Sequence, residues 1–261
     1  MQPLSSRQQS ILNRVIDQYI ETAQPVGSHA ITAIYTEIYQ GSYSSATVRH
    51  EMGSLEQMGY LTHPHTSAGR VPTDLGYRFY VDHGLQDSVI SQQMINRAED
   101  DLLAQKKEAE NLAENASSVL SEMVGELSVF ILPGRDKSGH VVYKVFLKGF
   151  KRMFEKPEFQ DLQKIRVLME VLEERIKILE VLNPKQTEGP VRVTIGKENT
   201  SEAFSDCSII SAGYAANEAM RGACAVIGPT RMRYNQTVPL VEKMSKVFSR
   251  VFSQLEWEEY S

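Results

Sequence analysis

Short hydroxyl side chains and an arginine are concentrated in one stretch of the chain, SSATVRHEM at residues 44–52. Hydroxyl groups bind phosphate oxygens, and an arginine can donate two hydrogen bonds to the edge of a guanine. On a helix that enters the major groove of DNA, such side chains lie in the first turns. The candidate DNA-contacting residues of this stretch are Ser44, Ser45, Thr47, Arg49 and His50.

Arg49 is the strongest candidate for reading a base. A bidentate contact between arginine and guanine discriminates against other bases by roughly 1 to 3 kcal/mol. The competing interpretation is an arginine neutralised by a nearby carboxylate, and Glu51 and Glu56 are the nearest in sequence. The sequence favours the DNA contact over this ion pair.

A second polar set lies in the loop HPHTSAGR at residues 63–70. A loop with proline and glycine cannot belong to the core, and its cations and hydroxyls suit phosphate or minor-groove contacts. A merely solvated loop is the alternative. The candidates are His63, His65, Thr66, Ser67 and Arg70. Two histidines separated by one proline, with no cluster of cysteines or carboxylates nearby, fall short of a zinc pattern, so we expect no metal and no cofactor.

Three helices and a hairpin are expected to position these residues. Helical periodicity and capping residues predict a helix over residues 5–21, a short helix from Ser28, a third helix after Ser44 or Ser45 that closes at Gly59, and strands around the loop at residues 60–61 and 71–72. Thr73 or Asp74 then caps a short aromatic helix. This order is that of a winged helix-turn-helix domain, which we assign to residues 1–84.

Residues 85–126 are expected to form a helical connector. Residues 88–126 contain no proline and only one late glycine, and apolar residues can be placed on a heptad pattern. One long helix and two helices with a hinge both fit. A dimerisation helix and a helix that packs on its own domain also both remain open.

Residues 127–261 alternate between strand and helix patterns, which predicts an α+β sheet domain. The predicted strands are LSVFILP, VVYKVFLKGF, PVRVTIGKEN, SIISAGYAA and ACAVIGP, and the helices cover residues 158–182 and 237–254. The first helix places Leu162, Ile165, Leu168, Leu172, Ile176 and Leu179 on one face. GRDKSGH at residues 134–140 reads as a linker. Cys207 and Cys224 lie in apolar runs and are expected to be buried structural thiols.

Charge is the main difficulty for a DNA-binding interpretation. The chain carries a net charge of −5, and residues 1–84 hold five arginines and no lysine against seven acidic residues. DNA binding must therefore be local, because phosphate neutralisation supplies most nonspecific affinity. Five of the six histidines lie in this segment, and each can become cationic beside a phosphate, so affinity should depend on pH.

Other classes of protein find little support. No phosphate-binding loop, nucleophile elbow or HExxH motif occurs, so an enzyme is not expected. No apolar stretch reaches membrane-spanning length, and no signal-peptide pattern is seen, so we expect a cytoplasmic protein without membrane contact.

Two sets of strings resemble the HrcA family of heat-shock repressors. LSSRQQSIL, YIETAQPVGS, SSATVRHEM, LEQMGYL and PHTSAGRVPTDLGYRFYVD are similar to its N-terminal domain. KPEFQD, RVTIGKEN, DCSIISAGY and VIGPTRMRY are similar to its C-terminal part, which implies a GAF-like sheet domain. The resemblance implies a homodimer on the inverted-repeat CIRCE operator of chaperone genes, repression lifted by heat, and the GroE chaperonin as a partner.

The chain departs from this family at two places. His50 stands where the family usually has asparagine, which puts its base contact in doubt. Between LSVFILP and VVYKVFLKGF the family has a much longer stretch with an inserted dimerisation domain, so the family's dimer contacts are in question and residues 88–126 become a substitute candidate. The rival hypothesis is a protein-interaction module built on an acidic winged domain that does not bind DNA.

Overall fold

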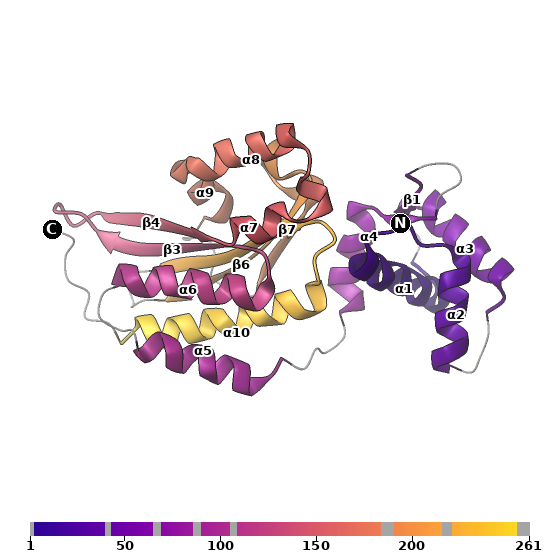
Figure 1. Cartoon of the computed structure of the whole chain (residues 1–261), viewed down its shortest axis with the longest axis horizontal. Helices are drawn as coiled ribbons and strands as arrows, with labels where there is room; N and C mark the ends of the chain where they lie inside the picture. The colour runs from indigo at the N-terminus through magenta and orange to yellow at the C-terminus, as the bar shows by residue number, and fades with distance from the viewer. Residues whose placement is uncertain are drawn as a thin grey trace. The chain divides into compact units, whose positions relative to one another are not determined.

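The structure is a computed structural model that describes residues 3–39, 43–64, 69–85, 90–104, 109–183, 191–215 and 221–254. The protein is a mixed α and β fold in two compact units (Figure 1). The first unit contains Met1–Asp87 together with Thr230–Tyr234, and the second contains Ser88–Pro229 and Asn235–Ser261.

The first unit begins with three helices at the predicted places: α1 (Ser6–Thr22), α2 (Ser28–Tyr39) and α3 (Ser45–Gln57). Ser5 and Gln8 form a capping box, in which each side chain bonds to the backbone N–H of the other, so α1 starts at a defined residue. One stripe of α1 is buried, comprising Ile11, Leu12, Val15, Ile16 and Ile20.

The predicted hairpin follows as β1 (Leu61–Thr62) and β2 (Val71–Pro72), which pair antiparallel. Of the two possible caps for the next helix, the structure uses Thr73, whose hydroxyl accepts from the Gly76 N–H at 3.1 Å. Helix α4 (Asp74–Phe79) continues into a π-helical turn, η1 (Tyr80–Gly84).

The segment Thr230–Tyr234 completes the first unit, although it lies close to the far end of the sequence. The buried ring of Tyr234 packs on that of Tyr77 in α4, with 5.8 Å between centroids. Arg231 donates from Nη1 to the carbonyl of Ile20 at 3.0 Å, in the last turn of α1, where a cation is favourable. No local sequence pattern predicts this association.

The second unit is built on one antiparallel sheet, in the order β4-β3-β7-β6-β5. Its strands are β3 (Leu127–Arg135), β4 (Val141–Lys148), β5 (Arg192–Ile195), β6 (Cys207–Ala215) and β7 (Arg221–Pro229). All five predicted strands are confirmed. The prediction of a linker at residues 134–140 is wrong. The Asp136 N–H donates to the His140 carbonyl at 3.0 Å, so this segment forms the tip of the β3–β4 hairpin.

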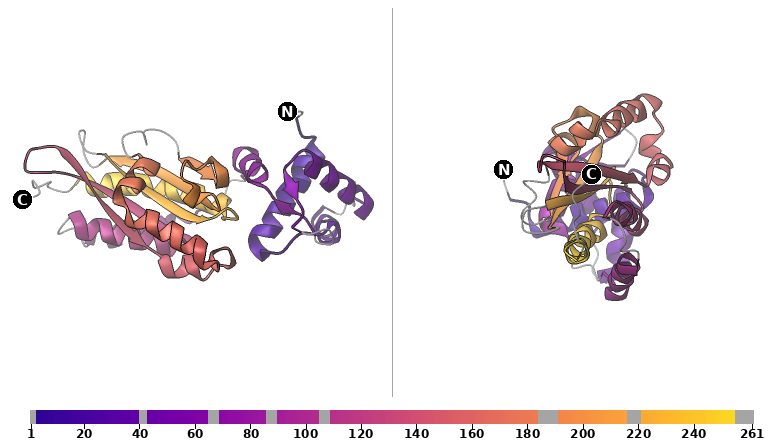
Figure 2. Two further views of the ribbon diagram at one scale, coloured as in Figure 1. Left: turned by 90° about the horizontal axis from the view of Figure 1, so that it is seen from above. Right: turned by 90° about the vertical axis from the view of Figure 1, so that its left-hand side faces the viewer.

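Helices cover both faces of this sheet (Figures 1 and 2). One face carries α7 (Phe150–Phe154), α8 (Leu162–Glu173) and α9 (Arg175–Leu182), with short 3₁₀ turns at Pro157–Phe159, Gly196–Glu198 and Glu202–Phe204. The other face carries α6 (Ala109–Val124) and α10 (Tyr234–Phe252), while α5 (Gln92–Ala104) lies beside α10. Strand β3 is therefore buried on both faces.

The connector is two separate helices, α5 and α6, and residues 105–108 between them lie outside the described residues. Helix α6 packs on β3 and β4 of its own sheet, and Lys144 of β4 forms an ion pair with Glu110 of α6. For α6 the structure therefore shows the second alternative, a helix packed on its own domain.

The single helix predicted over residues 158–182 is wrong. Glu174 has an extended backbone (φ −83°, ψ 92°) and separates α8 from α9. Two residues predicted on the buried face are exposed: Leu162, the first residue of α8, at 81%, and Ile176, which follows the break, at 72%. Both cysteines are free and buried as predicted, and burial raises the pKa of the Cys207 and Cys224 thiols to about 12.

Candidate nucleic-acid interface

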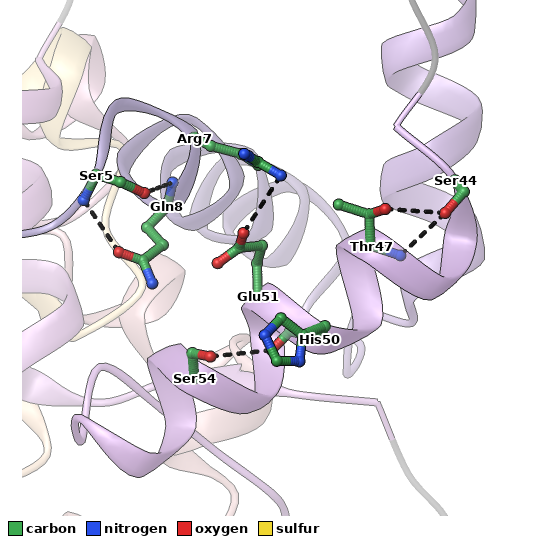
Figure 3. A network of polar contacts seen from close by, with 8 residues as sticks. All are labelled: Ser5, Arg7, Gln8, Ser44, Thr47, His50, Glu51 and Ser54. Atoms are coloured by element: carbon green, nitrogen blue, oxygen red, sulfur yellow. Dashed lines mark hydrogen bonds and ion pairs between the residues drawn. The ribbon is translucent and has the colours of Figure 1, made fainter.

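The first turn of α3 is organised by a hydroxyl pair (Figure 3). Ser44 is the N-cap and accepts from the Thr47 N–H at 3.1 Å, while the two hydroxyl oxygens lie 2.9 Å apart. Ser44 is exposed, so its hydroxyl can exchange this bond for a phosphate contact. The Ser45 hydroxyl instead faces α2, 3.4 Å from that of Ser28, and is only partly accessible.

Arg49 and His50 are exposed on α3. The two carboxylates considered as partners of Arg49 are engaged elsewhere: Glu51 lies 3.6 Å from Arg7, and Glu56 bonds to Arg70. Arg7, Arg14, Arg70 and Arg78 all form ion pairs with acidic residues of the first unit. In the part of residues 1–84 that the structure describes, Arg49 is the arginine without such a partner.

Arg7 is a neighbour of α3 that sequence reasoning missed. Its guanidinium lies over the ring of Tyr43, 5.6 Å from the centroid, and reaches Glu51 on α3. Figure 3 shows this arginine extending from the start of α1 toward α3. The two helices are distant in sequence, and no spacing rule connects Arg7 to Glu51.

Glu56, near the end of α3, holds the base of the hairpin loop. Its Oε2 accepts from Nε of Arg70 at 3.1 Å and lies 3.1 Å from Nη2 in the same ion pair, and His63 donates from Nδ1 to its Oε1. The Arg70 backbone also exchanges two hydrogen bonds of 2.9 Å with Val26. Arg70 and His63 are thus brought to α3, whereas the other loop candidates, His65, Thr66 and Ser67, lie outside the described residues.

Among the residues that the structure describes, no group of three or more histidines, cysteines and carboxylates could hold a metal ion. None of the helices described here is long and apolar enough to cross a membrane.

Known proteins that are similar to this chain identify its family and support its fold. Residues 83–238 match the protein family described as "HrcA protein C terminal domain". The chain is 29% identical to the heat-inducible transcription repressor HrcA of Shouchella clausii (strain KSM-K16), over 338 aligned positions that cover 93% of this chain and 96% of the relative. Because the alignment is longer than the 261-residue chain, the relative has residues for which this chain has no counterpart.

A solved structure has the same overall fold. It is described as the crystal structure of a hypothetical protein at 2.2 Å resolution, and it matches with a TM-score of 0.74 at 18% sequence identity. The match covers 96% of this chain and 99% of that one. It therefore shows the fold of nearly the whole chain.

Proposed function

Because the chain belongs to the HrcA family, we propose that it is a heat-inducible transcription repressor that binds a CIRCE-type inverted repeat in double-stranded DNA as a homodimer. In this proposal the first unit is a winged helix-turn-helix domain: α2 and α3 form the helix-turn-helix, and the loop between β1 and β2 is the wing. The second unit is the GAF-like domain. Bound repressor blocks transcription of chaperone operons.

The observation that supports the DNA-binding assignment most directly is the exposure of Arg49 and its lack of an ion-pair partner among the described residues. Arg49 is exposed in the N-terminal half of α3, and both nearby carboxylates are committed to other arginines. An arginine without an ion-pair partner among the described residues, beside the exposed residues Ser44 and His50, can donate two hydrogen bonds to a guanine. The remaining proposed contacts of α3 are Ser45 and Thr47.

The wing supplies the flanking contacts in this proposal. Arg70 and His63 at its base are held near α3, and His65, Thr66 and Ser67 belong to the same loop. Such contacts to phosphates set the orientation of the protein without reading the sequence.

The homodimer follows from the operator. An inverted repeat has a twofold axis, so two copies of α3 related by the same axis must read its half-sites. Heat lifts repression by lowering the active population, since a loss of 1 to 2 kcal/mol changes the folded ratio roughly 5- to 30-fold. In the proposal the GroE chaperonin helps to maintain the active form.

The test is a fluorescence anisotropy titration of a CIRCE-type inverted repeat and a scrambled duplex at two salt concentrations. We expect selective binding that weakens with salt, and loss of that selectivity in Arg49→Ala. Arg78→Ala is the matched control, because it removes the same charge from an arginine paired with Asp82 in the same unit. Size-exclusion chromatography with light scattering measures the dimer.

The same titration also tests the rival hypothesis, in which the protein is a protein-interaction module that does not bind DNA. Equal and weak binding to both duplexes by the wild-type protein, unchanged in Arg49→Ala, would contradict the repressor proposal. Equal losses in Arg49→Ala and Arg78→Ala would reduce the role of Arg49 to its charge.

A further inference from the structure

One carboxylate connects α3 to both ends of the hairpin loop. Glu56 lies in the last turn of α3, His63 follows β1, and Arg70 precedes β2. The Arg70 side chain is 18% exposed, and the side chains of Glu56 and His63 are each 30% exposed. At this depth the three groups form a partly desolvated cluster, in which charge-assisted hydrogen bonds are stronger than on an open surface.

Glu56 contacts only one edge of the Arg70 guanidinium and one ring nitrogen of His63. Arg70 donates from Nε to Oε2 and its Nη2 lies 3.1 Å from the same oxygen, while no contact of its Nη1 is found in the described part of the chain. His63 donates from Nδ1, so Nε2 is the ring nitrogen that remains. A guanidinium carries five N–H groups in a rigid plane, and holding one edge therefore orients the other.

We propose that Glu56 is a positioning residue for DNA binding: it holds the base of the wing on α3 so that Arg70 and His63 bind phosphates through their remaining edges. This inference rests on the proposed function. The backbone supports the same arrangement, because Arg70 also pairs with Val26, and a Cβ on Gly69 would come within 2.6 Å of the Val26 carbonyl oxygen. The loop base is thus anchored to the turn before α2 as well as to α3.

The direction in which Glu56→Gln changes the affinity for DNA distinguishes this positioning role from a purely electrostatic one. A carboxylate beside DNA repels phosphates, so charge alone predicts that Glu56→Gln strengthens binding. A positioning role predicts the reverse, because the substitution releases Arg70 and His63 from their places. We expect operator affinity to fall roughly tenfold or more, and the slope of log K against log salt to lose about 0.9 for each phosphate contact that is lost.

The matched control is Glu51→Gln, which removes the same charge from the same helix. Glu51 reaches only Arg7, at 3.6 Å, and contacts no wing residue among those described. We expect this variant to bind the operator as tightly as the wild-type protein or more tightly. Circular dichroism melts of each variant show whether α1 to α4 remain folded.

Arg70→Lys provides a second, independent variant. It keeps the positive charge but lacks the planar fork that can hold Glu56 on one edge and a phosphate on the other. We expect it to lose affinity as Glu56→Gln does, and we expect Glu56→Gln to add little in the Arg70→Lys background. If Glu56→Gln does not fold, Arg70→Lys alone decides.

The outcomes are distinguishable. Wild-type protein that shows no preference for the inverted repeat would overturn the proposed function itself. A selective wild-type protein, with a Glu56→Gln variant that binds equally well or better at an unchanged salt slope, overturns only the positioning role. Wild-type affinity in Arg70→Lys would overturn it as well.

Discussion

The two units of the protein use their polar side chains in opposite ways. The first unit exposes Arg49 and His50 and holds Arg70 and His63 of its hairpin on a carboxylate. The second unit buries strand β3 on both faces, and its described cavity, about 360 Å³, is mostly apolar. That cavity is lined by Val145, Leu147, Phe150, Met169, Leu172, Glu173 and Arg175. This contrast is the one that our proposal predicts, with DNA recognition by the first unit.

The largest expected change in the free energy of unfolding comes from a substitution in the core of the second unit. Phe130 of β3 is fully buried, stacks on Tyr214 at 4.8 Å, and contacts Phe248 and Phe252 of α10. Phe130→Ala should lower the free energy of unfolding by about 3 to 5 kcal/mol, because it leaves a cavity among three rings. Urea titration followed by circular dichroism measures the loss.

Hydrogen exchange then tests whether the loss is confined to the second unit. Peptides from β3 and β7 should lose protection in Phe130→Ala, while peptides from α1 and α3 should keep theirs. Equal losses in both sets would break the comparison, since the two units would then unfold as one. Leu162→Ala is the control, because this leucine is 81% exposed.

A smaller loss of stability is expected from a substitution at Gly69, where the hairpin of the first unit contacts the backbone before α2. A Cβ on Gly69 would lie 2.5 Å from the Val26 carbonyl carbon and 2.8 Å from the Pro25 carbonyl carbon, and backbone atoms cannot easily move away. Gly69→Ala should therefore destabilise the first unit by about 1 to 3 kcal/mol. Thermal melts and operator titrations of the same variant measure the change.

Gly53→Ala is the matched control for that prediction. Gly53 lies in the middle of α3, and a Cβ there would meet nothing within 4 Å. Alanine should stabilise the helix by roughly 0.5 to 1 kcal/mol, because glycine loses more backbone entropy on folding. A loss of stability in Gly53→Ala would show that α3 contacts something the described residues do not include.

The smallest expected effect is a pH dependence of the stability of the first unit. Burial raises the pKa of the Asp17 carboxyl, although the Tyr80 hydroxyl donates to it at 2.6 Å and Arg14 is near. A raised pKa stabilises the folded state below the ordinary value of 3.8, and this contribution is lost as the pH rises through the native pKa. Relative to Asp17→Asn, the wild-type protein should therefore become less stable over that interval.

Urea titrations of the wild-type protein and of Asp17→Asn at several pH values, in which the unfolding of the first unit's helices is followed, measure this difference in stability. Tyr80→Phe removes the hydrogen bond that lowers the Asp17 pKa, so the loss of stability should extend to higher pH in that variant. A wild-type protein that instead becomes more stable relative to Asp17→Asn as the pH rises would contradict the assignment.

Prediction from the sequence was most accurate where the signal is local. The capping serines at 5 and 44 and the helical periodicity located α1 and α3, and alternating or continuous apolar runs located the five strands of the sheet. It was wrong at Glu174, where a helical pattern continues through a break. It was also wrong at residues 134–140, because a hairpin turn and a linker have the same composition.

The candidate site shows the same division. Arg49 and His50 were found because an exposed position near a helix start can be read from spacing. Arg7 and Glu56 were not assigned their contacts, since those contacts join α1 to α3 and α3 to the hairpin. The contact of Tyr234 with Tyr77 is of the same kind.

The sequence by itself determined the family resemblance, the helices and strands, and the polar residues available for DNA. Only the tertiary structure decided which acids neutralise which arginines, and so left Arg49 without an ion pair among the described residues. It also decided that α6 packs on its own sheet and that Thr230–Tyr234 belongs to the first unit. The physical reason is that propensity and capping act within a few residues, whereas packing and ion pairing depend on distances in space.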